Sequence, residues 1–314
     1  MNCRIPVIID TDPGIDDAIA IMLAHASDRI EIVGLTPVDG NVKAEHTFKN
    51  ALNLSEFLGI NCPVAKGAEK QLSVQASAHG ENIHGVTGLG NVILPEAKGS
   101  FVEEPAWDFI YSKAKELKGE LVIAAIGPLT NVAKAIISHP DIKNYIKKLV
   151  IMGGGTEGGN RTPYAEFNFW IDPPAAEVVF NSGIPIVMAG LNVTLKTGIS
   201  IDFINSLAEK KSLIADVIKN MVDTYNDRAL GKSGNSVSVV HDAIPMFFIA
   251  HPECCKTEMC KIAINTEQGK ARWGESAVSY DKPQEFNTEL ITDVDMDTYE
   301  NFYTEMIEFF ADIN

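Results

Sequence analysis

The chain has 314 residues and is 46% hydrophobic, enough for one large α/β domain or two smaller ones. Its formal net charge of −16 would repel nucleic acids and anionic membrane surfaces, so we expect neither as a partner. The five cysteines are odd in number and lack the paired spacing of a zinc site or a disulfide framework. Because there is no apolar run of membrane-spanning length and no long apolar leader, we expect a cytoplasmic protein.

Strand-like and helix-like segments alternate along the chain. Apolar, often β-branched runs predict buried strands at residues 7–10, 30–38, 121–126, 148–152 and 184–189. Apolar residues at helical spacing predict helices at residues 15–26, 43–58, 107–117, 129–138, 174–181 and 215–228. Shorter strands and loops are expected at residues 253–292, and a closing helix at residues 299–310. This alternation predicts an α/β fold, formed by a single domain over residues 1–314, with a mostly parallel open sheet and helices on both faces.

Four aspartates lie within eight residues at the turn between the first predicted strand and the first predicted helix: Asp10, Asp12, Asp16 and Asp17. A helix N-terminus offers about half a positive charge, too little to neutralise four carboxylates. Hard cations such as Ca²⁺ or Mg²⁺ prefer oxygen ligands of this kind. We therefore expect a metal site here. The alternative is that Asp10 ends a strand while Asp16 and Asp17 simply occupy the first helical turn.

Polar residues also follow the other predicted strands. Asn41 follows the second predicted strand, and Asn131 follows the third. A run of three glycines follows the fourth strand and leads to Asn160, Glu166 and Asn168. Asn192 follows the fifth strand. Ligands of open α/β sheets bind outside the carboxyl ends of the strands. Amide and carboxylate groups at that edge bind hydroxyls without needing a charged partner. The pattern predicts a site for a neutral, hydroxyl-rich ligand.

Several motifs occur in order between residues 7 and 242. They are Asp10-Thr-Asp-Pro-Gly-Ile-Asp-Asp17, Asp39-Gly40-Asn41, Asn82-Ile-His-Gly85, Gly127-Pro-Leu-Thr-Asn131, Met152-Gly-Gly-Gly155, Ala165-Glu-Phe-Asn168 and His241-Asp242. Together they resemble the inosine–uridine-preferring nucleoside hydrolase family, and the acidic, aromatic C-terminal helix also fits. The resemblance covers nearly the whole chain.

The resemblance implies a calcium-dependent enzyme that hydrolyses the N-glycosidic bond of purine and/or pyrimidine ribonucleosides to ribose and free base, in nucleoside salvage. The Ca²⁺ ligands of the family match the carboxylates of Asp12, Asp17 and Asp242 and the backbone carbonyl of Ile126. Asp12 also matches the general base, a metal ligand that contacts the attacking water. Because relatives form dimers or tetramers, we expect a homodimer or homotetramer.

The resemblance also implies where the substrate binds. The ribose-binding residues of the family match Asp16, Asn41, Asn160, Glu166 and Asn168. Carboxylates at these positions would stabilise the positive charge that the ribose ring develops as the base departs.

Two histidines match family positions near the departing base. His241 matches the residue proposed in one subgroup as the general acid, and a histidine titrates near neutrality, as this task requires. The alternative for His241 is that it only supports the metal site through its neighbour Asp242. His84 matches a second family histidine close to the base, although an ordinary loop histidine is almost as good an interpretation.

The base preference does not follow from the resemblance. Some members have a second tyrosine four residues after the one that matches Tyr225, where this chain has Ala229. The small, polar residues 231–236 that follow suggest a mobile flap over the base. A hydrolase restricted to pyrimidine nucleosides is therefore an alternative. Trp170 and Trp273 are interpreted as structural.

Three other functions each explain part of the sequence. A haloacid-dehalogenase-type phosphatase would use Asp10 as nucleophile and Asp12 as acid–base, but the later lysine and acidic pair of that fold do not stand out. A nucleoside phosphorylase could hold phosphate at Arg161, yet the acidic surroundings would repel it. A non-catalytic sugar-binding module would need neither the acidic cluster nor His241.

Overall fold

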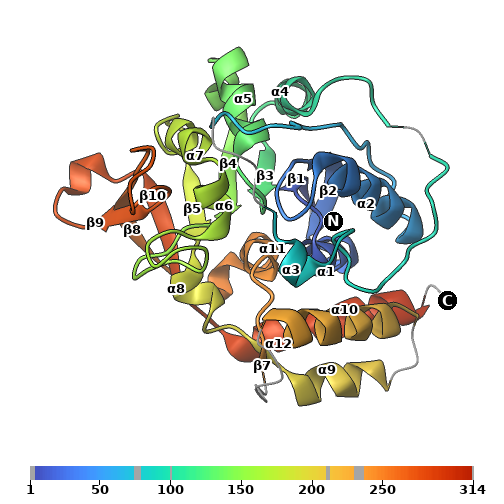
Figure 1. Ribbon diagram of the computed structural model, residues 1–314. Coiled ribbons are helices and arrows are strands. Elements are labelled where there is room, and N and C mark those ends of the chain that lie inside the picture. Colours follow the sequence, from blue (N-terminus) through green and yellow to red (C-terminus); the bar gives the residue numbers. More distant parts are fainter. Residues whose placement is uncertain (1–3, 74–78, 100, 210–212, 230–236, 313–314) are drawn as a thin grey trace.

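An eight-stranded sheet forms the centre of the described residues, which are 4–73, 79–99, 101–209, 213–229 and 237–312 of a computed structural model. Its strand order is β2-β1-β3-β4-β5-β10-β8-β9 (Figure 1). The first six strands in this spatial order, which are β2, β1, β3, β4, β5 and β10, are parallel to one another. Strand β8 pairs antiparallel with both of its neighbours, β10 and β9. The strands are β1 (Ile5–Thr11), β2 (Ile30–Pro37), β3 (Leu121–Ala125), β4 (Ile146–Met152), β5 (Ile186–Ala189), β8 (Cys255–Ile264), β9 (Ser276–Ser279) and β10 (Thr288–Val294).

Helices cover both faces of this sheet. Successive side chains of a strand point to opposite faces, so Val7 and Ile9 of β1 enter one hydrophobic cluster and Ile8 enters the other. The first face is covered by α1 (Ile15–Ala26), α2 (Ala44–Phe57), α10 (Leu213–Ala229), α11 (Ala243–Ala250) and α12 (Met296–Asp312). The second face is covered by α4 (Ala106–Glu116), α5 (Thr130–Ser138) and α7 (Pro173–Phe180) (Figure 1).

Shorter elements lie mainly in the connections between the strands. The short helices are α3 (Glu81–His84), α6 (Phe167–Ile171), α8 (Leu191–Thr194) and α9 (Ile201–Ala208). Single 3₁₀ turns are η1 (Ile142–Asn144), η2 (Pro252–Cys254) and η3 (Pro283–Glu285), and a separate two-stranded ribbon joins β6 (Ile199–Ser200) to β7 (Val237–Ser238). Three of these short helices, α3, α6 and α8, carry residues of the candidate site described below.

The predicted fold class is confirmed: the chain forms a single α/β domain with a mostly parallel sheet and helices on both faces. The five predicted strands correspond to β1–β5, and the predicted helices to α1, α2, α4, α5, α7, α10 and α12. For residues 253–292 the sequence predicts only shorter strands and loops. In the structure β8 is ten residues long, and β10 joins the main sheet beside β5. The predicted flap at residues 231–236 lies outside the described residues. Among the described helices, none has the length and apolar character to cross a lipid bilayer.

We expect Ile291→Ala to destabilise the fold, because Ile291 lies on β10 and its side chain is completely buried. Truncating a buried isoleucine typically lowers the free energy of unfolding by about 2–5 kcal/mol. Urea denaturation of the chelator-treated protein measures this change. The control is Asp293→Ala on the same strand, where the side chain is 57% exposed and pairs with Lys256, and where about 1 kcal/mol or less is expected. Equal losses for the two variants would contradict the packing described here.

Candidate active site

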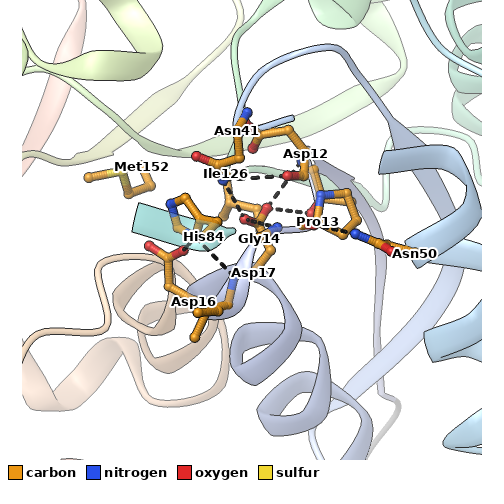
Figure 2. Close-up of polar contacts among 12 residues, drawn as sticks. Asp12, Pro13, Gly14, Asp16, Asp17, Asn41, Asn50, His84, Ile126 and Met152 are labelled. Atoms are coloured by element: carbon orange, nitrogen blue, oxygen red, sulfur yellow. Dashed lines mark hydrogen bonds and ion pairs between the residues drawn. The ribbon is translucent and has the colours of Figure 1, made fainter. Parts of the chain in front are cut away.

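Asp17 organises the turn between β1 and α1. Gly14, the N-cap of α1, has no side chain with which to satisfy the free N–H groups of the helix start. The carboxylate of Asp17, the third residue of the helix, instead reaches back and accepts hydrogen bonds from the backbone N–H groups of Gly14 at 2.9 Å and Asp12 at 3.1 Å (Figure 2). The Thr11 hydroxyl and the side-chain amide of Asn41 donate to the same carboxylate. These four donors offset part of the cost of burying its charge.

Asp10 lies behind the turn and is completely buried. One of its oxygens accepts hydrogen bonds from the Thr36 hydroxyl at 2.6 Å and the Asn131 side-chain amide at 2.9 Å. Burial raises the pKa of Asp10 to about 7. This aspartate therefore ties the ends of β1 and β2 to the start of α5 and does not line the pocket described below. A phosphatase that needs Asp10 as an accessible nucleophile does not fit this arrangement.

Asp12 is enclosed by two glycines of the predicted motifs. A side chain at Gly40 would collide with one of its carboxylate oxygens, and a Cβ at Gly127 would lie 2.6 Å from the other. The first oxygen, Oδ2, accepts a hydrogen bond from the backbone N–H of Asn41 at 2.6 Å. The second, Oδ1, is buried and has no hydrogen-bond partner among the described residues. The two glycines therefore make room for a carboxylate that keeps one oxygen available.

The acidic cluster has the features of a cation site. Carboxylate oxygens of Asp16, Asp17 and Asp242 lie within 4.8 Å of one another, and all three residues are buried. Burial, and then the nearby charges of Asp16 and Asp17, raise the pKa of Asp242 well above its usual range. Within the described part of the chain, Oδ1 of Asp16 also has no hydrogen-bond partner. Unpaired buried carboxylates are costly, and a hard divalent cation with oxygen ligands would remove that cost. The residues present therefore fit Ca²⁺.

The structure brings the predicted ligands together with one difference. Asp17 and Asp242 belong to the tight cluster, but its third member is Asp16, which the sequence analysis assigned to the ribose, whereas Asp12 lies beside it. The backbone carbonyl of Ile126 lines the same site and accepts a hydrogen bond from the Asn168 side-chain amide at 2.9 Å. A carbonyl has a second lone pair, so this bond leaves one acceptor position. The ligand set Asp12, Asp17, Ile126 and Asp242 stays a prediction.

A pocket of about 210 Å³ adjoins the cluster at the carboxyl edge of the sheet. It contains all six residues that the sequence analysis assigned to the substrate, although they are far apart in the sequence. The residues that line it are Asp16, Asn41, His79, Gly80, Asn82, Ile83, His84, Ile126, Met152, Asn160, Arg161, Glu166, Phe167, Asn168, Tyr225, His241 and Asp242.

Glu166 and Asn168 form one wall of the pocket. Glu166 is the N-cap of α6, and its carboxylate accepts hydrogen bonds from the backbone N–H groups of Asn168, Phe169 and Gly154 at 2.9–3.2 Å. Burial raises the pKa of Glu166 to about 7, although these donors act in the opposite direction. The side-chain amide of Asn168 donates to the backbone carbonyls that end β3 and β4. Asn160 lies at the exposed rim, where its side-chain oxygen accepts from the N–H of Phe167 at 2.9 Å.

His84 is fixed by the helix that carries the aspartates. Its Nδ1 accepts a hydrogen bond from the backbone N–H of Ile15 at 3.1 Å, so the neutral ring carries its hydrogen on Nε2. Burial lowers the pKa of His84 to about 4. Its ring centroid lies 5.8 Å from that of Tyr225 on α10. Its Nδ1 lies 3.8 Å from a carboxylate oxygen of Asp16 (Figure 2). His84 is therefore a pocket residue and not an ordinary loop histidine.

His241 lies next to Asp242, at the start of α11. Its Nδ1 is 2.8 Å from the hydroxyl of Thr194. Burial, and then the neighbouring His84, lower the pKa of His241 to about 4. The two histidines therefore share the pocket but differ in what holds them: His84 faces a backbone donor, and His241 faces a hydroxyl.

Not all of the residues that the sequence singled out contribute to the pocket. Asn192 lines a separate surface cleft, and its side-chain amide donates to the carbonyl of Ile291 on β10, so its predicted place in the site is wrong. Trp273 is buried and donates a hydrogen bond to the carbonyl of Trp170, and neither lines the pocket. The guanidinium of Arg161 stacks on Trp170 with 4.6 Å to the ring centroid. The structural interpretation of both tryptophans is confirmed.

Several residues at the site were not predicted from the sequence. His79 and Phe167 line the pocket, and Thr194 contacts His241 from behind. Thr194 and Asn192 both lie in the segment that follows β5. The position of this segment at a strand end correctly predicted that it contributes to the site, but the contributing side chain is Thr194 and not Asn192. His79 had no recognisable signal, because its segment is brought to the site by tertiary contacts.

Comparisons with known proteins agree with this site. Residues 7–301 match the family described as inosine-uridine preferring nucleoside hydrolase. A pyrimidine-specific ribonucleoside hydrolase, RihA of Salmonella typhimurium, is 35% identical over 98% of this chain and 99% of its own length. Among solved structures, a purine-preferring ribonucleoside hydrolase from Gardnerella vaginalis superposes with a TM-score of 0.92 at 28% identity, over 98% of this chain and 100% of that one. A plant nucleoside hydrolase superposes with a TM-score of 0.89 at 26% identity, over 97% and 99%.

The fold, the acidic pocket and these similarities define the class of the protein as a hydrolase that acts on N-glycosyl compounds. The chain belongs to the inosine-uridine preferring nucleoside hydrolase family.

We expect Ca²⁺ to stabilise the protein more strongly as the pH rises. Burial raises the pKa of Asp16 from 3.8 to about 6, and the pKa values of Asp12, Asp17 and Asp242 are also raised. Across that interval the folded, metal-free chain binds more protons than the unfolded chain, so its free energy of unfolding falls as pH increases. Ca²⁺ requires the deprotonated carboxylates, so its effect on Tm should grow over the same interval.

Thermal scans with Ca²⁺ and with chelator, at about pH 5 and about pH 7.5, measure this difference. The variant Asp242→Asn should reduce the Ca²⁺-dependent rise in Tm, whereas Asp141→Asn at an exposed site should not. An identical Ca²⁺ effect at both pH values would contradict the assignment of the cluster as the cation site.

Proposed function

We propose that the protein hydrolyses the N-glycosidic bond of purine and/or pyrimidine ribonucleosides in a Ca²⁺-dependent reaction, releasing ribose and free base for nucleoside salvage. The observation that carries this proposal is the buried acidic cluster beside a pocket that also holds three histidines, His79, His84 and His241. Carboxylates and amides on one side suit the hydroxyls of a sugar, and histidines suit a departing base.

The acidic cluster supports water activation. Asp12, Asp17 and Asp242, with the carbonyl of Ile126, would hold Ca²⁺, which supplies a positive charge that lowers the pKa of water and orients the ribose hydroxyls. Asp12 has a buried carboxylate oxygen without a hydrogen-bond partner among the described residues. That oxygen suits a general base that removes a proton from the attacking water. The water oxygen then bonds to C1′ of the ribose as the bond from C1′ to the base nitrogen breaks.

The ribose would bind among Asp16, Asn41, Asn160, Glu166 and Asn168, all of which line the pocket. As the base departs, positive charge develops on the ribose ring, and nearby carboxylates stabilise it. The hydrogen bonds of Glu166 and Asn168 to the backbone fix these side chains before substrate arrives.

His241 would act as the general acid that protonates the departing base. Burial lowers its pKa to about 4 in the free protein, below the near-neutral value that suits this task, so proton donation requires that substrate binding raises this pKa. His84 is less suited to this task, because a proton on its Nδ1 would break the hydrogen bond that this nitrogen accepts from the N–H of Ile15. The Thr194 hydroxyl, in contrast, can accept a hydrogen bond from a protonated His241. We assign His84 to binding the base and His241 to proton donation.

A second candidate is a hydrolase restricted to pyrimidine nucleosides. It is favoured by the RihA relative, named pyrimidine-specific and 35% identical to this chain over nearly its full length. The purine-preferring relative, at 28% identity, favours the broader proposal.

The experiment that tests the function measures ribose release from inosine, adenosine, guanosine, uridine and cytidine. We expect ribose from at least one nucleoside, loss of activity with chelator, and recovery with Ca²⁺. Ribose should form at the same rate with or without phosphate, because the site is acidic and Arg161 is stacked on Trp170. Asp12→Asn should lower kcat by about 10²-fold or more, while the exposed control Asp141→Asn should match the wild type. A product that appears only with phosphate would indicate a phosphorylase instead.

We expect strong discrimination against 2′-deoxynucleosides. If buried carboxylates and a cation bind the ribose hydroxyls, removing one hydroxyl leaves polar groups unpaired, which can cost up to about 10⁴-fold in kcat/KM. The measurement compares the preferred nucleoside with its 2′-deoxy form at equal Ca²⁺. Similar values of kcat/KM for the pair would argue against ribose binding by Asp16 and Asn168.

We also propose that the protein is a cytoplasmic homodimer or homotetramer. The cysteines Cys62, Cys254, Cys255 and Cys260 are free thiols in the described part of the chain, which suits a reducing compartment. Light scattering after size-exclusion chromatography determines the oligomeric state.

A further inference from the structure

Thr194 lies behind His241, at the end of the single helical turn α8. Its side chain is completely buried, and its hydroxyl is 2.8 Å from Nδ1 of His241. The start of the turn is tied to the loop after β4, since the N–H of Leu191 donates to the carbonyl of Gly154, and the N–H of Thr194 closes the turn by donating to the carbonyl of Gly190. The hydroxyl therefore has a fixed position relative to the carboxyl edge of the sheet.

This contact determines which nitrogen of His241 faces the pocket. His241 lines the pocket, whereas Thr194 does not. Because Thr194 holds Nδ1, the nitrogen left for a ligand is Nε2, on the other side of the ring. A hydroxyl both donates and accepts hydrogen bonds, so it can hold the ring whether or not Nδ1 carries a hydrogen. The backbone N–H that holds His84 can only donate.

We propose that Thr194 is a positioning residue for the glycosidic reaction, and that it orients the His241 ring so that Nε2 points at the departing base. The proposal rests on the function proposed above, in which His241 donates a proton. Thr194 itself does not touch the substrate. Its effect should therefore appear only where the base needs protonation.

The chain offers a matched control in Thr197. This threonine is also buried, 3% exposed, and lies three residues further on. Its hydroxyl donates to the backbone carbonyls of Val193 at 3.4 Å and Thr194 at 3.1 Å. Thr194→Val and Thr197→Val each remove one buried hydroxyl at nearly constant volume, but only the first removes a partner of His241.

The experiment compares two substrates in each variant. One is the nucleoside that the wild type hydrolyses fastest, and the other is p-nitrophenyl riboside, whose leaving group departs without protonation. Thr194→Val should lower kcat for the nucleoside by roughly 3- to 10-fold, the effect of one hydrogen bond, and leave p-nitrophenyl riboside within about 2-fold of the wild type. Thr194→Ser should restore the nucleoside rate, and Thr197→Val should change both substrates by the same factor.

Combining Thr194→Val with His241→Ala tests whether the two residues act together. If Thr194 acts through His241, the double variant should be no slower on the nucleoside than His241→Ala alone. If Thr194→Val does not fold, Thr194→Ala takes its place, and turnover of p-nitrophenyl riboside reports that the site is intact.

Equal slowing of both substrates by Thr194→Val, or additive effects with His241→Ala, would overturn the proposal. Failure of the wild type to release ribose from any nucleoside would instead overturn the proposed function.

Discussion

Buried carboxylates stand side by side where β1 meets α1, and the surrounding structure is arranged to tolerate their repulsion. Asp12 and Asp17 are fully buried and Asp16 is 8% exposed. Burial disfavours each negative charge, and each charged neighbour disfavours it further. Hydrogen-bond donors converge on Asp17 and offset part of this cost within the protein. Asp12 and Asp16 each keep an oxygen without such a donor among the described residues, which suits a cation.

The loops at the strand ends are shaped by the same constraint. Gly40 and Gly127 contact the Asp12 carboxylate so closely that neither position can carry a side chain without displacing it. Gly154 has a positive φ of 68°, which glycine adopts without strain, and its N–H donates to Glu166. Glycines in these motifs thus bring the backbone close to acidic side chains.

The pocket has two unlike sides. On the side of Glu166 and Asn168, polar side chains are tied to backbone groups at the ends of β3 and β4. On the other side, His84 and Tyr225 come from α3 and α10, and their rings contact each other. A pocket with one side tied to the backbone and the other made of side chains from separate helices fits a family in which relatives carry names with different base preferences.

Local patterns determined most of the long elements before residue 253, because burial dictates where apolar residues recur with a period of two or of 3.6. They also identified the acidic turn, since four aspartates in eight residues demand neutralisation wherever the turn lies. Only the tertiary structure decided which side chains meet. It placed Asp16 with Asp242 in the tight cluster, directed Asn192 to another cleft, and set Thr194 behind His241. It also inserted β10 beside β5. These pairings join residues far apart in the chain, and their geometry depends on how strands and helices pack, which no local pattern records.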